Sequence, residues 1–354
     1  MKPFLIGTMF FLISTIFNNE MAQEIRPVRD NVGFCWNADE MDSVINYLSN
    51  SCDGKEFNPK NLVAAISPHD DYLYAGRVYF PLYKILRTKE VVIFGVTHGT
   101  VRKAMNDPQN ILIFDDYKYW RGPYKNVEVS PLRDIIKNSL NKEYFITSDK
   151  AQDIEHSIEA LIPFLQHYNR DIKITPIMVT AMPYDRMKII SEELSGIIIK
   201  YIKQNSLEIG KDIFFLISTD ANHYGEDFDN SPHGMNDKAH QTATGIDKSI
   251  ANSCLTGTID ESKIKELTAK LWPDTSSNSD KPLWCGRYPI PFGLLTAVTV
   301  INIIENRQIT GEIFKYSDTW TEKVLPIKNT HLGLTAPFSL KHWVGFLSAG
   351  FYLK

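Results

Sequence analysis

Three histidines stand just beyond three short apolar runs of this chain. His69 ends the run LVAAISPH, His98 ends VVIFGVTH, and His223 closes IFFLISTDANH, which also contains Asp220. Neutral imidazole is the commonest metal ligand, and a carboxylate or thiolate beside it would complete a mononuclear site with room for water or substrate. Any one of these histidines could instead form structural hydrogen bonds. Their repetition at the ends of three runs favours a metal-capable site.

The three apolar runs, residues 62–66, 91–96 and 213–218, are rich in β-branched and aromatic side chains and lack polar alternation. Such runs are typical of strands that are buried on both faces, as in a parallel sheet. In an open α/β sheet the ligand crevice lies beyond the carboxyl ends of the strands. We therefore predict an α/β fold whose central sheet brings these histidines together at one edge.

Residues 1–22 differ in kind from the rest of the chain. A lysine precedes an apolar stretch over residues 4–17, and polar residues follow. This layout predicts a secretory signal peptide and a periplasmic or extracellular location. An uncleaved membrane anchor is the alternative, because the region around Ala22 is a poor cleavage site. The remainder is expected to be an amino-terminal extension, residues 23–60, followed by one α/β domain, residues 61–354.

The composition is that of a globular protein with a large core. Of 354 residues, 43% are hydrophobic, which is enough for one large domain. The formal net charge of −4 comes from 38 basic and 42 acidic residues that are intermixed, so no nucleic-acid partner is expected. Residues 341–354 are apolar but shorter than a membrane span, and they predict a strand. We expect no membrane contact beyond the signal peptide.

The four cysteines fall in different contexts. Cys35 and Cys52 could form a local disulfide in an oxidising compartment, since they would close a short loop ahead of the first core strand. Cys285 lies in LWCGRYPIPFGLL, where a glycine and two prolines lead into a predicted helix over residues 292–305. A thiol at such a junction could be a metal ligand or a reactive thiolate. Burial as a small apolar residue is the alternative.

A further segment, residues 151–168, carries apolar side chains at helical spacing. This pattern predicts a helix that is kinked at Pro163, since proline lacks the N–H that a helix interior requires. Glu155 and His156 stand near its start. They could be an acid and base pair that lines the crevice, or a charged first turn that interacts with the helix dipole.

Five motifs of this chain resemble one known family. SPHDDYLYAG, VTHGT, EHSIEALIPFL, STDANHYG and CGRYPIPFGLLTAV occur in the order and approximate spacing of the MEMO family, the MEMO-like or AmmeMemoRadiSam system protein B group. The resemblance extends from residue 62 to the carboxyl terminus. It implies a fold related to the class III extradiol dioxygenases, in which a central mixed, largely parallel sheet is flanked by helices and a mononuclear metal site lies at the sheet edge.

The resemblance also implies a ligand set. The family's metal ligands fall on His69, His98 and Cys285. In the related dioxygenases the third ligand is a carboxylate, which with two histidines leaves iron open to oxygen and substrate. A cysteine in its place is a softer and more electron-donating ligand, which favours iron or copper redox chemistry over ordinary catechol cleavage.

The remaining polar groups of the pocket follow from the same resemblance. Asp220 and His223 fall on the family's pocket acid and histidine, with Glu155 and His156 beside them, and these four are the candidate catalytic residues. His223 occupies the place of an acid–base histidine in ring-cleaving relatives.

This chain also departs from the family pattern. Asp70 and Asp71 replace the small residues that usually follow the first histidine, and either carboxylate could be a ligand or a hydrogen-bond acceptor behind one. An exported copy could not share cytosolic partners with intracellular relatives. Its thiol must also survive oxidation, and metal binding would protect Cys285 by holding it as a ligand.

Three functions are compatible with these residues. The leading hypothesis is a mononuclear non-haem iron or copper protein, an oxidoreductase of dioxygenase type that acts on a small organic or peptide substrate. Loss of the third carboxylate supports an alternative, a non-catalytic module that binds a ligand or peptide. A zinc-dependent hydrolase is the third, since two histidines and a cysteine suit zinc-activated water, with Glu155 or Asp220 as the base.

Overall fold

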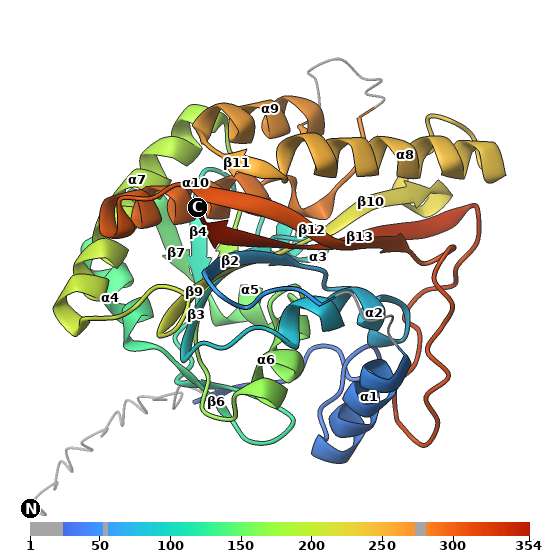
Figure 1. Ribbon diagram of the computed structural model, residues 1–354, viewed down its shortest axis with the longest axis horizontal. Helices are drawn as coiled ribbons and strands as arrows, with labels where there is room; N and C mark the ends of the chain where they lie inside the picture. The colour runs from blue at the N-terminus through green and yellow to red at the C-terminus, as the bar shows by residue number, and fades with distance from the viewer. Residues whose placement is uncertain (1–23, 52–55, 273–280) are drawn as a thin grey trace, which may run out of the picture.

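A single mixed sheet crosses the molecule, with helices against both of its faces (Figure 1). The structure is a computed structural model that describes residues 24–51, 56–272 and 281–354, and the predicted signal peptide lies outside them. Within the described residues the sheet has 13 strands. Its main path runs through β1 (Ile25–Arg26), β5 (Tyr119–Trp120), β6 (Val127–Val129), β8 (Lys173–Val179), β3 (Glu90–Val96), β9 (Ile213–Ser218), β2 (Leu62–Ser67), β13 (His342–Leu353), β12 (Ile309–Asp318) and β11 (Gly257–Ile259). Off this path lie β10 (Asp220–Gly225), β4 (Leu112–Phe114) and β7 (Phe145–Thr147).

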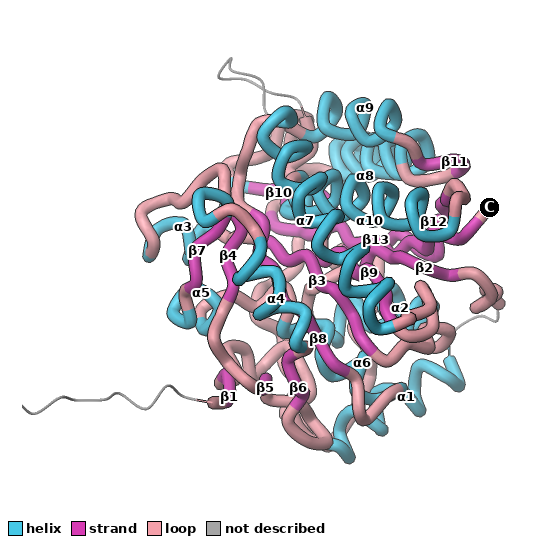
Figure 2. Tube along the Cα trace, turned by 90° about the vertical axis from the view of Figure 1, so that its left-hand side faces the viewer, coloured by secondary structure: helices cyan, strands magenta, loops and turns pink. Residues whose placement is uncertain are grey.

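Two helical layers enclose the sheet (Figures 1 and 2). The first layer contains α4 (Pro131–Ser139), α7 (Tyr184–Asn205), α8 (Asp237–Cys254), α9 (Glu261–Leu271) and α10 (Pro289–Glu305). The second contains α1 (Ala38–Ser51), α2 (Tyr72–Tyr83) and α6 (Ile162–Tyr168). Two short helices follow strands, α3 (Gly99–Ala104) after β3 and α5 (Asp149–Asp153) after β7. These layers confirm the predicted α/β class.

The three predicted strands are the centre of the sheet. β2 pairs parallel with β9, and β9 pairs parallel with β3. Ser67 at the end of β2 lies opposite Ser218 at the end of β9, so these two carboxyl ends are level. His69 and Asp220 each follow two residues later. The expected convergence of polar residues at this edge therefore has a structural basis in the strand register.

Burial on both faces explains why these strands lack polar alternation. In β3, Val92 and Phe94 belong to the core on the side of α7 and α10, whereas Val91 and Ile93 belong to the core on the side of α1 and α2. All four side chains are fully buried. Each contributes on the order of 1.5–3 kcal/mol by leaving water, so the strands that hold the polar edge are anchored from both sides.

The carboxyl-terminal region contains the predicted strand and a helix that is longer than predicted. The apolar tail forms β13, which pairs antiparallel with β2, β12 and β10 and makes the sheet mixed. The helix expected over residues 292–305 is α10, and it begins earlier, at Pro289. Proline fits the first turn of a helix, where its missing N–H has no partner to lose.

The continuous helix predicted over residues 151–168 is wrong. α5 ends at Asp153, residues 154–158 form a non-helical loop, and a 3-10 turn at Glu159–Leu161 leads into α6. Pro163 lies in the first turn of α6, so it starts this helix rather than kinking a longer one. Glu155 is consequently not in a first helical turn, and its carboxylate folds back to accept backbone N–H groups of the loop, as described below.

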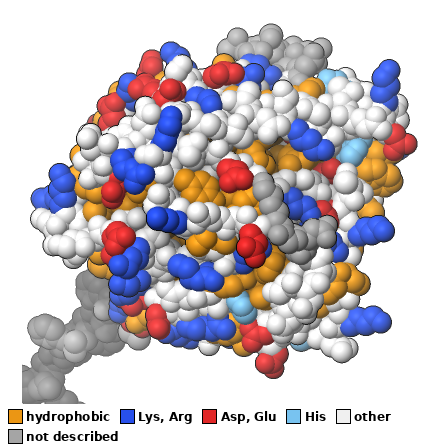
Figure 3. All heavy atoms as spheres, in the orientation of Figure 1, with side chains coloured by type: hydrophobic (Ala, Val, Ile, Leu, Met, Phe, Trp, Pro, Cys, Tyr) orange, Lys and Arg blue, Asp and Glu red, His pale blue; other side chains and the backbone are white. Residues whose placement is uncertain are grey.

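The predicted disulfide and the absence of a membrane span can be compared with only part of the chain. Cys35 is buried, and its expected disulfide partner Cys52 lies outside the described residues. No helix within residues 24–51, 56–272 and 281–354 is both long and apolar enough to cross a membrane. On the face shown in Figure 3, basic and acidic side chains are interspersed, as the intermixed charges of the sequence predict.

A buried carboxylate joins α8 to the sheet behind this edge. Asp247 accepts hydrogen bonds from Nε1–H of Trp284 and from the hydroxyl of Tyr316, each at 2.7 Å. Burial raises the pKa of Asp247 to about 7, although both hydrogen bonds act in the opposite direction. The folded protein therefore favours the protonated carboxyl more than the unfolded chain does.

This raised pKa predicts a pH dependence of stability. The contribution of Asp247 to the free energy of unfolding should be greatest below its ordinary value of 3.8 and should fall as pH rises to about 7. Relative to Asp247→Asn, wild type should lose on the order of 4 kcal/mol across that window. Denaturant unfolding at a series of pH values measures this difference. Asp185→Asn on the exposed side of α7 is the control, and parallel pH profiles for wild type and Asp247→Asn would contradict the prediction.

Candidate metal centre

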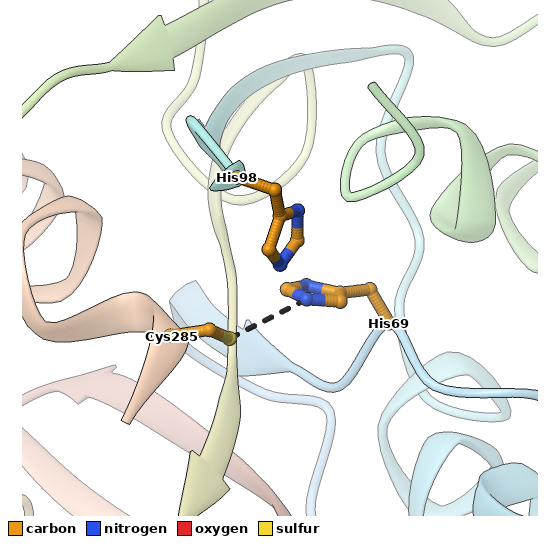
Figure 4. Close-up of side chains that lie close together, drawn as sticks. All are labelled: His69, His98 and Cys285. Atoms are coloured by element: carbon orange, nitrogen blue, oxygen red, sulfur yellow. Dashed lines mark hydrogen bonds between the residues drawn. The ribbon is translucent and has the colours of Figure 1, made fainter. Parts of the chain in front are cut away.

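Side chains from three separate elements meet at the polar edge of the sheet (Figure 4). His69 follows β2, His98 follows β3, and Cys285 begins the 3-10 turn Cys285–Arg287 that leads into α10. One potential ligand atom from each of the three lies within 4.8 Å of the others. Sγ of Cys285 is 3.4 Å from Nε2 of His69, and the two imidazole rings meet edge to face with centroids 5.1 Å apart.

A chain of hydrogen bonds fixes the tautomer of His69. The hydroxyl of Ser218 donates to the carbonyl oxygen of Ser157 at 2.6 Å, so its oxygen is left to accept a proton from Nδ1 of His69 at 2.8 Å. Nδ1 therefore carries the proton, and the lone pair of Nε2 is directed toward Cys285. Burial, with the charges of His98 and His156, lowers the pKa of His69 well below its usual value. The ring is thus a neutral imidazole, the form that binds metals.

Glu155 orients the second histidine. Its Oε1 accepts from Nδ1 of His98 at 2.7 Å and from the backbone N–H groups of His156 and Ser157, while its Oε2 accepts from the N–H of His98. Burial would raise the pKa of Glu155, but the charge and hydrogen bonds of His98 outweigh it and hold this pKa well below the usual range. A carboxylate behind a ligating histidine sets its tautomer and ring orientation, and Glu155 has this position.

Glycine permits this loop to reach the sheet. A Cβ at Gly95 of β3 would collide with the side chain of Ile158 and would lie 3.0 Å from Oγ of Ser157. Ser157 fills this space with a hydroxyl that accepts from the N–H of Val96 at 3.0 Å. The glycine in the run VVIFGVTH is therefore required for close packing of the loop that holds Glu155.

A second close approach positions Cys285. A Cβ at Gly286 would collide with Thr219, so only glycine lets the turn approach the end of β9. Sγ of Cys285 consequently accepts a hydrogen bond from the N–H of Asp220 at 2.9 Å. Burial, with the charge of Asp220, raises the pKa of this thiol well above its usual value. A bound cation would favour the thiolate, since a coordinating thiol loses its proton.

Asp220 and His223 lie beside the three candidate ligands. Oδ1 of Asp220 accepts from the N–H of His69 at 3.0 Å, and Oδ2 is 3.3 Å from Nε2 of His69. Burial raises the pKa of Asp220 to about 7. Burial, with the charge of His98, lowers the pKa of His223 to about 3, and its buried Nε2 has no hydrogen-bond partner within the described residues. Both groups can therefore exchange or accept a proton at this site.

His156 is a neighbour of the candidate ligands. Its ring stacks parallel to that of His98, with centroids 4.7 Å apart, and Phe34 stacks at 6.4 Å. Burial, with the charge of His98, lowers the pKa of His156 to about 4. The side chain is 38% exposed, so it offers a neutral ring to the adjoining cavity.

Two cavities meet at this centre. The larger, which we call the outer cavity, has a volume of about 910 Å³ and is lined by residues that include Phe34, His69, His98, His156, Asp220 and His223. The smaller, which we call the inner cavity, has a volume of about 150 Å³ and is lined by residues that include His98, Gly99, Arg102, His223, Cys285 and Arg287. His98 and His223 border both cavities. A molecule in either cavity can therefore contact candidate ligands.

The structure brings together all seven site residues that the sequence singled out. It also adds residues that the sequence did not single out, Ser157, Ser218, Phe34, Arg102 and Arg287. Single serines, arginines and a phenylalanine carry no spacing signal. Among these residues, only Ser218 has a position, the end of a predicted strand, that could have indicated a place in the site.

Asp70 and Asp71, the other acidic residues considered, are engaged elsewhere. Asp71 accepts from the N–H and hydroxyl of Thr335, and Asp70 accepts from the N–H of Asp71. Neither belongs to a group of possible ligand atoms within the described residues.

The donor set fits a transition metal. In both histidines Nδ1 is hydrogen-bonded to a protein group, which leaves Nε2 free to bind a metal. Nε2 of His69 is directed toward Sγ of Cys285, and the ring of His98 lies close to both groups. Two other groupings are close enough, one of His98, Glu155 and His156 and one of Asp220, His223 and Cys285. The first is disfavoured because the Glu155 oxygens already accept four hydrogen bonds. Two imidazoles and a thiolate suit iron, copper or zinc.

This arrangement defines an α/β protein with a candidate metal centre at the carboxyl ends of its central strands. The family model described as Memo-like protein matches residues 33–321. The chain therefore belongs to the Memo-like family, which confirms the resemblance seen in its motifs.

Curated relatives carry the same family name. A MEMO1 family protein of Pyrococcus furiosus is 31% identical over 183 residues, which cover 49% of this chain and 56% of the relative. One of Aquifex aeolicus is 31% identical over 174 residues, covering 48% and 58% respectively. The chain thus spans little more than half the length of the curated relatives it matches.

Ser218→Ala should weaken metal binding without a comparable loss of stability. The variant lacks the Ser218 hydroxyl that accepts a hydrogen bond from Nδ1 of His69. Loss of a hydrogen-bond partner behind a ligating histidine typically lowers metal affinity about 10–100-fold. Competition titration with a chromogenic chelator measures the affinity. Ser195→Ala, which removes another buried hydroxyl within α7, is the matched control. Equal affinity in wild type and Ser218→Ala would show that this hydrogen bond does not position a ligand.

Proposed function

We propose that this chain is a mononuclear non-haem metal protein in which His69, His98 and Cys285 hold iron or copper, and that it performs dioxygenase-type redox chemistry. The observation that carries the proposal is the convergence of these three donors at the junction of two cavities. Family membership adds support through the motifs that contain the donors.

Each protein group has a defined part in this proposal. Iron or copper, when bound, would supply one-electron redox chemistry and activation of oxygen. Ser218 and Glu155 hold the rings of His69 and His98 in the ligating orientation. His223 accepts or donates a proton at its unpartnered Nε2, and Asp220 holds a second exchangeable proton near His69.

The outer cavity is suited to a small organic or peptide substrate. Its volume of about 910 Å³ is in the range of small-molecule and cofactor sites. Phe34 and Tyr74 give it aromatic walls, and the ring of His156 lies beside Phe34. A substrate that displaces water here would lie beside His69 and His98, two of the residues that would hold the metal.

A zinc-dependent hydrolase is the second candidate. The observation that favours it is Asp220, a buried carboxyl whose pKa of about 7 is suited to a general base near neutral pH. Its Oδ2 lies 3.3 Å from Nε2 of His69, so this carboxyl would stand beside zinc held by His69 and could accept a proton from water there. Zinc with two histidines and a cysteine would lower the pKa of that water.

Elemental analysis of anaerobically purified protein tests the ligand set and the metal together. Wild type should hold near-stoichiometric iron or copper, and Cys285→Ser should lose most of it because the softest of the three ligands is removed. Cys254→Ser in α8 is the matched control, since Cys254 is also a buried thiol but lies outside the site. His223→Ala should retain its metal, because its role is proton transfer.

Each alternative result has a distinct meaning. Near-stoichiometric zinc that is lost in Cys285→Ser would favour the hydrolase. Metal content that is equal in wild type and Cys285→Ser would contradict the proposed ligand set. Substoichiometric metal in every variant would favour a binding module without turnover.

A further inference from the structure

The two cavities that meet at the candidate metal centre differ in charge. The outer cavity is lined by one arginine, Arg29, and by five aspartates, which are Asp30, Asp70, Asp71, Asp220 and Asp227. The inner cavity is lined by two arginines, Arg102 and Arg287, and by no acidic residue. The charged residues that line the outer cavity are therefore mainly aspartates, and those that line the inner cavity are two arginines, of which Arg102 is exposed and Arg287 is partly buried.

The two arginines lack acidic partners. Nε of Arg287 is buried and has no hydrogen-bond partner within the described residues, while its Nη1 donates to the carbonyl oxygen of Trp284 at 3.1 Å. Neither Arg102 nor Arg287 forms an ion pair with an acidic side chain in the described part of the chain. A buried guanidinium N–H without an acceptor is costly, so an anionic ligand there would satisfy it.

The size of the inner cavity and the helix end beside it suit a small anionic group. Its volume is about 150 Å³. A cavity needs roughly 10–15 Å³ to hold one water molecule, so several groups of that size fit. Tyr288 and Pro289, at the amino-terminal end of the 17-residue α10, form part of its wall. The positive end of the helix dipole adds to the attraction for an anion.

We propose that the inner cavity binds the carboxylate or phosphate group of the substrate, between Arg102 and Arg287, while the remainder of the substrate occupies the outer cavity. The inference deepens the proposed function, because it names the chemical class of substrate for the same metal centre. Cys285 and His98 line the inner cavity, so an anion held there fixes the distance between the substrate and the metal.

Calorimetric titration of inorganic phosphate and of acetate into chelator-treated full-length protein tests this inference without any metal. Wild type should bind at least one of the two anions at millimolar concentration, and which one binds distinguishes phosphate from carboxylate. Arg287→Gln and Arg102→Gln should each weaken that binding about tenfold or more, since each removes a charge-assisted hydrogen-bond donor. Arg287→Lys keeps the charge and should retain part of the affinity.

Arg121→Gln is the matched control, because Arg121 is exposed and borders a separate surface pocket while its loss changes the net charge equally. It should bind as wild type does. Absence of binding by wild type to both anions, or equal binding by wild type and both inner-cavity variants, would overturn the inference. Elemental analysis of the same preparations before chelation reports the metal centre separately, so the failure of one proposal is distinguishable from the failure of the other.

Discussion

The geometry of the candidate metal centre depends on one buried residue, Ser157. Its carbonyl oxygen accepts the Ser218 hydroxyl that orients His69, and its N–H donates to the Glu155 carboxylate that orients His98. Its own hydroxyl bridges the N–H and carbonyl oxygen of Val96 at the end of β3. A single loop residue thus couples the two imidazoles to each other and to the sheet. Rigid support of this kind is what keeps metal ligands within the narrow geometry that coordination requires.

Burial sets the protonation states that this geometry can use. Water exclusion lowers the pKa values of His69, His156 and His223, so three of the four histidines in the cluster are neutral near pH 7. His98 differs because the Glu155 carboxylate raises its pKa in spite of burial. The cluster therefore combines three neutral imidazoles with one imidazole, that of His98, which is hydrogen-bonded to a carboxylate. A cation bound in this cluster would be close to the lone pair on Nε2 of His69 and to the ring of His98, which the Glu155 carboxylate orients.

Much of this arrangement follows from the sequence because parallel strands end at a common edge. The runs that end near His69, His98 and His223 are buried on both faces, and that burial produces the uninterrupted apolar pattern from which the strands were predicted. Cys285 was different, since only the family motif connected it to the histidines. Its approach depends on the fit of Gly286 against Thr219, a contact between residues 67 positions apart that no local pattern encodes. The loop at residues 154–158 was missed for a related reason. Its apolar residues have helical spacing, but hydrogen bonds to Glu155 and the close contact with Gly95 override local preference.

The central claim is that His69, His98 and Cys285 bind one metal ion together. X-ray absorption spectroscopy at the metal edge, on protein loaded with iron or copper under anaerobic conditions, tests this most directly. The account predicts one sulfur scatterer at roughly 2.3 Å, the distance typical of metal–thiolate bonds, together with imidazole nitrogens, and loss of the sulfur signal in Cys285→Ser. A first shell of nitrogen and oxygen alone in the wild-type protein would contradict it.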